Sequence, residues 1–245
     1  MEFLAVPARS GATRESVGAA PASVCLIAIL APRFAKLPAA QRKLWPALRP
    51  GVAMGFVLYG GTAVSLHLGH RRSIDFDFFN DRPLEAAAVR AAFGLGRSVQ
   101  TLQQSRNTLV VHTAGVKVSF FGGLDFGRVG EPMVTRDGVA QIASLADLMA
   151  HKLKVILQRA EKKDYQDIAA MLAAGVPLDR GLAAARLMFG KSFQPAESLK
   201  ALTWFKDGDL SGLSPAIRKT LIAASAKVAQ LPKIKLQSRY LAARI

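Results

Sequence analysis

The sequence predicts an α/β (α+β) fold, in which a core with a mixed β-sheet is followed by an all-helical C-terminal region. Two observations lead to this prediction. Short apolar or alternating segments typical of strands fall between residues 56 and 121, and helical periodicity prevails from residue 144 almost to the end. We therefore expect an N-terminal extension over 1–37, an α/β domain over 38–125 and a helical domain over 126–245.

The composition of the chain excludes several classes of protein. With 51% hydrophobic residues among 245, the chain can bury a core, which argues against a disordered protein. Its single cysteine, Cys25, cannot form a disulfide within the chain. The longest apolar run, 24–31, is far shorter than the ~20 residues of a membrane-spanning helix. We therefore expect no membrane partner, a cytoplasmic location and a short packed helix in that run.

The first half of the chain alternates helical and strand-like segments. A helix is expected over 38–48, and a buried strand over 56–59 ends at two consecutive glycines. Thr62 is a favourable N-cap for the next helix, and Gly69 is a favourable C-cap. These signals predict a strand, a tight turn and a short helix in succession.

The next strand carries two acidic residues on one face. Residues 74–79 alternate, so that Asp75 and Asp77 lie on one side and apolar side chains, beginning with Ile74, lie on the other. The further elements expected in this half are a helix at 84–93, strands at 98–103, 108–113 and 116–121 with a hairpin turn at Gly115, and a short strand near Met133.

Helical periodicity dominates the second half. It begins at Ser144, an N-cap candidate with Asp147 three residues later, and apolar side chains then recur at helical spacing over 145–157. The further helices expected are 165–172, 181–189, 196–204 and 215–229.

Positive charge is unevenly distributed along the chain. The net charge is +16, and 126–245 holds 19 basic against 10 acidic residues, whereas 51–125 holds 7 against 5. The segment 218–245 has seven basic residues and no acidic one. It would suit the phosphate backbone of RNA, although a solvated basic tail explains it equally well. The charge as a whole predicts a polyanionic partner or, alternatively, a basic enzyme without one.

The glycines and the two acidic residues together suggest phosphate chemistry. Gly60 and Gly61 follow a strand, so the backbone there can approach a phosphate, and the next helix directs N–H groups at that anion. Asp75 and Asp77 repel each other unless a cation lies between them, and Mg²⁺ is a natural occupant. This order of elements indicates metal-dependent transfer of a nucleotidyl group.

Arginines near the same strand strengthen this interpretation. Arg71 and Arg72 directly precede the strand and could add positive charge beside the phosphates. Each feature alone also has a structural explanation, because two glycines often form an ordinary turn and alternating acids often mark a solvated strand edge. Their order and spacing together favour a functional site.

Two parts of the sequence resemble a known family. The run from Gly60 to Phe79 resembles the first motif of the AbiEii-type nucleotidyltransferase toxins, a branch of the DNA polymerase beta-like nucleotidyltransferase superfamily. Lys152, Arg159 and the stretch 163–168 resemble the family's helical motif of Lys, Arg and (Arg/Lys)-Asp-x-x-Asp. The resemblance covers roughly 38–210, and the glycine–carboxylate motif is its specific part.

The resemblance implies a nucleotidyltransferase core that takes NTP and Mg²⁺, with one or two metal ions, and attaches a nucleotide to an acceptor. It implies that the acceptor is RNA, with the acceptor end of tRNA as the target, and that a cognate antitoxin is a partner. The residue roles that it implies are the metal at Asp75 and Asp77, the triphosphate at Gly61 and Thr62, the nucleotide phosphates at Lys152, and orientation or base catalysis by Asp164 or Asp167. Gly60, Arg72 and Arg159 complete the predicted nucleotide-binding set.

The sequence departs from the family in one position. Superfamily members commonly carry a third carboxylate on a later strand, and Ser119 stands at the equivalent position in 116–121. A third Asp would act as general base. Its absence leaves open that another group takes this role, that the acceptor is already activated, or that catalysis is slow or lost.

Several alternatives stay open at this stage. The acceptor could be a small hydroxyl compound or a protein, or the chain could be a catalytically silent descendant that binds nucleic acid or a partner. A surface network of helical ion pairs would account for Arg159, Lys163 and Asp164 without catalysis. Phe121 and its aromatic neighbours could stack on a base, but core packing is the default for such side chains.

Overall fold

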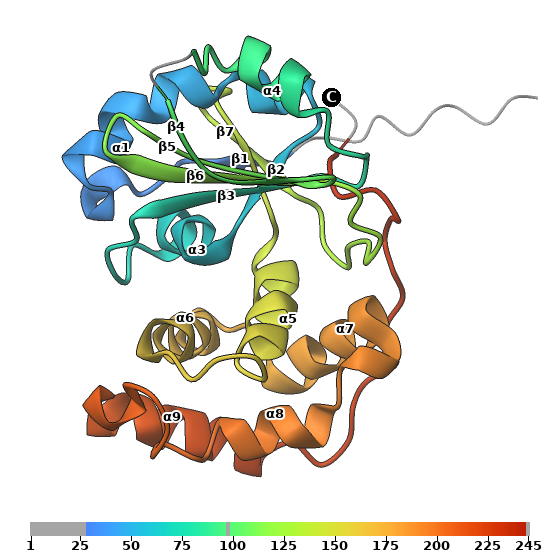
Figure 1. Cartoon of the computed structure of the whole chain (residues 1–245). Helices are drawn as coiled ribbons and strands as arrows, with labels where there is room; N and C mark the ends of the chain where they lie inside the picture. The colour runs from blue at the N-terminus through green and yellow to red at the C-terminus, as the bar shows by residue number, and fades with distance from the viewer. Residues whose placement is uncertain (1–27, 97–98, 244–245) are drawn as a thin grey trace, which may run out of the picture.

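An eight-stranded mixed sheet forms the centre of the computed structural model, which describes residues 28–96 and 99–243 (Figure 1). The strand order is β1-β7-β8-β2-β3-β6-β5-β4, with both parallel and antiparallel neighbours, so the predicted mixed sheet is confirmed. The strands are β1 (Ile29–Leu30), β2 (Val57–Tyr59), β3 (Asp75–Phe79), β4 (Gln100–Ser105), β5 (Thr108–Thr113), β6 (Val116–Phe121), β7 (Met133–Thr135) and β8 (Gln141–Ile142).

Helices lie on both faces of this sheet. In Figure 1, α1 and α4 lie on one side, α3 lies on the other, and α5 to α9 lie beyond α3 on that same side. The helices are α1 (Ala39–Leu44), α2 (Pro50–Ala53), α3 (Gly60–Leu68), α4 (Ala86–Ala92), α5 (Leu145–Val155), α6 (Lys162–Ala173), α7 (Leu178–Phe189), α8 (Pro195–Ala201) and α9 (Pro215–Ala226), with 3₁₀ turns at Phe34–Lys36, Trp45–Leu48, Gly190–Ser192 and Leu210–Gly212. No helix in the described part of the chain is long and apolar enough to cross a membrane.

The sheet extends on both sides of the range 38–125 predicted for the α/β domain. β1 precedes that range and pairs in parallel with β7, and β7 and β8 follow it. The apolar run 24–31 therefore contributes a strand at Ile29–Leu30, and the helix expected there is wrong for these residues. The reason is long-range, because Ile29 pairs with Val134 and local hydrophobicity does not reveal that partner. The division into domains itself stays a prediction.

Local signals placed several element boundaries correctly. Gly69 ends α3 in the left-handed conformation, with a φ of 63°, and Ala114 and Gly115 form the hairpin turn with positive φ. At α5 the side-chain oxygen of Ser144 accepts a hydrogen bond of 3.1 Å from the N–H of Asp147, as the N-cap signal predicts. The apolar face of α5, which includes Leu148, is buried in the core.

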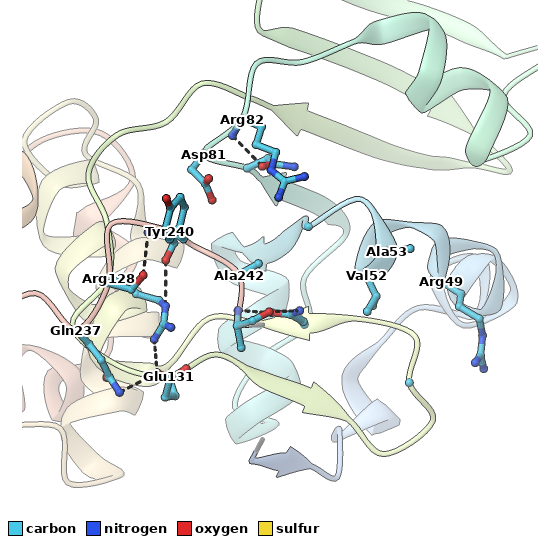
Figure 2. A pocket seen from close by; sticks show the side chains of 16 residues that line it. Arg49, Val52, Ala53, Asp81, Arg82, Arg128, Glu131, Gln237, Tyr240 and Ala242 are labelled. Carbon is cyan, nitrogen blue, oxygen red and sulfur yellow. Dashed lines mark hydrogen bonds and ion pairs between the residues drawn. The ribbon is translucent and has the colours of Figure 1, made fainter. Parts of the chain in front are cut away.

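The chain after α9 returns to the sheet. Figure 2 shows its last described residues beside the loop that leads into β7, and the segment lines a cavity of about 1050 Å³. Nε of the buried Arg128 donates to the carbonyl of Tyr240 over 3.0 Å, and Gln237 donates to Glu131 over 2.8 Å. Leu241 is fully buried. This part of the basic segment is therefore packed against the fold rather than a solvated tail.

Candidate active site

The predicted site residues gather around one cleft between the sheet and the helices that follow it. The cleft has a volume of about 500 Å³, and its walls include β3, β6 and α5. Seven of the ten predicted residues line it, namely Gly60, Gly61, Arg72, Asp75, Asp77, Lys152 and Arg159. The other three, Thr62, Asp164 and Asp167, are buried and do not belong to its lining.

The two glycines are required by close contacts at the start of α3. Gly60 has a φ of +74°, and a Cβ atom there would collide with the carboxylate of Asp77. A Cβ atom on Gly61 would lie 2.5 Å from Nη2 of Arg71 and 3.0 Å from Oγ of Ser73. Because both residues lack a side chain, a carboxylate, a guanidinium and a hydroxyl can lie close to the backbone here.

Thr62 is not the N-cap that the sequence suggests. α3 begins at Gly60, with Tyr59 in the N-cap position, so Thr62 lies within the first turn and is not the N-cap. Its buried hydroxyl donates a hydrogen bond to the backbone carbonyl of Asp75. Thr62 thus fixes α3 against the first residue of β3, and its hydroxyl is not directed into the cleft.

The two acidic residues share one face of β3, as predicted. Phe76 and Phe78 are buried on the opposite face, but Ile74, which was expected with them, is 60% exposed because the strand begins one residue later. Burial and the neighbouring charge of Asp75 raise the pKa of Asp77 above its usual range. The charges of Lys117 and Lys152 oppose this shift of the Asp77 pKa but do not outweigh it.

The neighbouring strand offers no further carboxylate to this pair. In the parallel register of β3 and β6, Asp75 lies opposite Lys117, with 3.4 Å between the charged atoms, and Asp77 lies opposite Ser119. Ser119 thus occupies the place where the resemblance leads one to expect a third acid. Across the described ranges, no group of three or more His, Cys, Asp or Glu residues is arranged to hold a metal ion.

Behind the cleft, α5 and α6 contain a buried group of charges. Asp164 and Asp167 have no exposed surface, and Nζ of Lys152 lies 2.6 Å from an oxygen of each. Arg159 donates from Nε to Asp164 over 2.8 Å, while Arg71 and His70 contact Asp167 from the loop before β3. Lys152 and Arg159, which face the cleft, are therefore held by carboxylates behind it.

The surroundings of these carboxylates make them poor proton acceptors. Burial would raise the pKa of Asp167, but the charge of Lys152 and hydrogen bonds from His70 and Arg71 outweigh it and hold the pKa far below the usual range. The pKa of Asp164 is lowered as well. Burial raises it, but the charges of Lys152 and Arg159 and their hydrogen bonds to this carboxylate outweigh burial. The geometry thus fits orientation of cations, and it does not favour base catalysis by either residue.

A surface network of ion pairs also exists beside the cleft. Glu161 lies 2.6 Å from Lys163 and 3.6 Å from Arg159, and all three side chains are at least 40% exposed. The helical ion-pair alternative therefore accounts for Lys163, whereas Asp164 belongs to the buried group.

His151 is a lining residue that the sequence reasoning did not select. Its ring packs edge-on against Phe79, with 5.1 Å between the centroids, and Phe121 also lines this end of the cleft. Burial, followed by the charge of Lys152, lowers the pKa of His151 to about 4. Its position directly before Lys152 is the signal that could have revealed it. Phe120 is fully buried and belongs to the core.

Comparison with known proteins places most of the chain in one family. Residues 44–218 match the family described as "Nucleotidyl transferase AbiEii toxin, Type IV TA system". The uncharacterized protein aq_aa25 of Aquifex aeolicus (strain VF5) is 34% identical to this chain over 136 residues. That match spans 54% of this chain and 66% of the relative, slightly less than two thirds of the relative's length.

Proposed function

We propose that this chain, which belongs to the AbiEii nucleotidyl transferase toxin family, transfers a nucleotide from an NTP to an RNA acceptor, with the acceptor end of tRNA as the first candidate. One observation carries the proposal. The cleft that contains the glycine turn and the two acids of β3 is lined by six basic side chains and only two acidic ones. Such a charge balance suits a triphosphate and an RNA backbone.

The glycine turn would receive the phosphates. The backbone N–H groups at the start of α3, and the guanidinium of Arg71 beside Gly61, would donate to the phosphate oxygens. Arg71, Lys152 and Arg159 line the same cleft and would neutralise the negative charge of the triphosphate.

The acids of β3 suit Mg²⁺. Asp75 and Asp77 point from one face of the strand, and the raised pKa of Asp77 reflects burial and a repulsion that a bound cation would relieve. Two carboxylates with substrate oxygens are a common ligand set for this ion. Bound there, one or two Mg²⁺ ions would polarise the phosphate that is attacked and stabilise its developing charge.

The RNA acceptor would approach over the exposed rim of the cleft. Three lining residues have exposed cationic groups, namely Arg72, Lys117 and Lys163. They do not belong to the buried group of charges, so they can contact phosphates without breaking its ion pairs. We also propose a cognate antitoxin as a partner, since the matched family is that of a toxin in type IV toxin–antitoxin systems.

The proposal is tested by incubating the purified protein with total RNA, Mg²⁺ and each labelled NTP in turn. We expect label on RNA with the wild type and none with Asp77→Ala. Asp125→Ala, which removes an exposed carboxylate outside both cavities, is the matched control and should transfer normally. Absence of transfer from every NTP to RNA, protein or small molecules would overturn the proposal.

The same assay separates the alternatives. Label on a small hydroxyl compound or on a protein would assign another acceptor to the same chemistry. Ser119 in place of a third acid favours one further candidate, a catalytically silent binding protein. That candidate requires a wild type without affinity for NTP or Mg²⁺, and RNA or partner binding that survives replacement of both Asp75 and Asp77.

A further inference from the structure

Arg71 and Asp167 form a two-point contact between the loop before β3 and α6. Nε of Arg71 donates to Oδ1 of Asp167 over 2.6 Å, and Nη2 donates to Oδ2 over 2.8 Å. The two residues are 96 positions apart in the chain, and the carboxylate is fully buried while the arginine side chain is 16% exposed. This geometry fixes the plane of the guanidinium.

The guanidinium also lies close to the glycines at the start of α3. Nη2, which contacts Asp167, lies 2.5 Å from the position of a Cβ atom on Gly61, and Nη1 donates to the carbonyl of Arg72 over 2.8 Å. A guanidinium has five N–H donors, of which Asp167 and that carbonyl use three, so within the described part of the chain two are left for a ligand. Arg71 lines the cleft, whereas Asp167 does not.

Asp167 also holds a second cation of the cleft. Its Oδ2 lies 2.6 Å from Nζ of Lys152, and among residues 28–96 and 99–243 the contacts of this ammonium with Asp167 and Asp164 leave one N–H donor over. One buried carboxylate thus sets the position of both Arg71 and Lys152 relative to the glycine turn. An ammonium and a guanidinium fixed at a constant spacing are a preorganised site for a chain of phosphates.

We propose that Asp167 is a positioning residue that holds Arg71 and Lys152 as a rigid clamp for the phosphates of the nucleotide, and that Arg71 contacts these phosphates directly. The inference rests on the proposed function for the identity of the ligand. It assigns a nucleotide contact to Arg71, and it assigns to Asp167 a role in binding and none in proton transfer.

The clamp is tested by calorimetric titration of the full chain with inorganic triphosphate and Mg²⁺, which needs neither an acceptor nor a known base. Arg71→Lys keeps the charge but removes the two-point contact, and Asp167→Asn keeps the shape but removes the charge. We expect each to weaken binding by about 10- to 100-fold, the range that follows from losing a hydrogen bond to a charged group. The double variant should bind triphosphate about as weakly as either single variant, because the two residues act as one unit and their effects do not add.

Arg90→Lys is the matched control, since Arg90 bonds Thr101 and Gln104 and lines neither cavity. In the transfer assay, Arg71→Lys should raise the KM for NTP by the same factor as the dissociation constant for triphosphate. If Asp167 had a purely structural role, Asp167→Asn would have a lower melting temperature, but the folded variant would bind triphosphate with unchanged affinity. That result would overturn the proposal.

Further outcomes are equally decisive. If Asp167→Asn does not fold, unchanged triphosphate affinity of folded Arg71→Lys overturns the clamp, and weakened affinity supports it. A wild type that does not bind triphosphate at all also overturns it. If triphosphate binding depends on Arg71 while no NTP is ever transferred, the clamp stands and the proposed transfer reaction fails.

Discussion

Gly60 lies directly against the carboxylate of Asp77, so that a Cβ atom on residue 60 would collide with Oδ2. The contact joins the first residue of α3 to the middle of β3 and brings the predicted phosphate-binding backbone next to a predicted metal ligand. It explains why this turn contains glycine at a φ of +74°.

Gly60→Ala should therefore lose nucleotide transfer and lower the free energy of unfolding by about 2 kcal/mol, because it adds left-handed strain and displaces Asp77. Gly55→Ala is the matched control. Gly55 has a similar φ of +77°, but a Cβ atom there would meet only Nδ2 of Asn80, at 3.8 Å. In urea unfolding, Gly55→Ala should lower the free energy of unfolding by about 1 kcal/mol, the cost of the backbone strain, and it should retain transfer activity. Equal loss of activity in both would contradict a specific role of the Gly60 contact.

Asp164→Asn should destabilise the protein by about 3 kcal/mol in urea unfolding. The change removes the carboxylate between Lys152 and Arg159 in a fully buried position and leaves part of their charge uncompensated. Glu161→Gln removes an acid that also pairs with Arg159, but at the surface, and it should cost less than about 1 kcal/mol. A small effect of Asp164→Asn would mean that the buried charge group contributes little to stability.

His151 should make the protein less stable in acid. Its pKa is lowered to about 4 in the folded state from 6.5, so the unfolded chain binds the proton more tightly as the pH falls through this window. This destabilisation by His151 is absent well above pH 6.5. At pH 5 it lowers the free energy of unfolding by up to about 2 kcal/mol.

Urea unfolding at pH 7.5 and at pH 5 measures this effect. His151→Gln should lose less stability between the two values than the wild type, whereas His112→Gln, at an exposed position on β5, should behave like the wild type. Asp77 and Asp147 have raised pKa values and act in the opposite direction, but they are common to all three proteins. An unchanged pH dependence in His151→Gln would refute the assignment.

The returning C-terminal segment should contribute to stability through Leu241. This side chain is fully buried, and its backbone N–H donates to Asp81 over 2.9 Å. Leu241→Ala should cost about 2–5 kcal/mol because it leaves a cavity. Tyr240→Ala, which removes a side chain that is 59% exposed, should change stability by about 0.5 kcal/mol or less. Similar melting temperatures for both variants would indicate that the segment is not docked in solution.

Much of the site was predictable because its signals are local. Gly60, Gly61, Asp75 and Asp77 lie within one strand–helix–loop–strand unit, so their spacing alone places them together. Lys152 and Arg159 were found through a resemblance in the helical part, and both line the same cleft. The N-cap prediction for Thr62 was wrong, because a hydroxyl near a helix start can cap the helix or, as here, donate to a neighbouring strand.

By itself, the sequence determined the glycine turn, the carboxylate strand and the start of α5, since backbone preference and side-chain alternation act over a few residues. The tertiary structure alone decided that β1 joins the sheet beside β7, that Leu241 is buried, and that Asp167 holds Arg71 from 96 positions away. These features depend on which distant segments meet, and a buried carboxylate is stable only where cations surround it. Local sequence patterns do not reveal which distant segments meet.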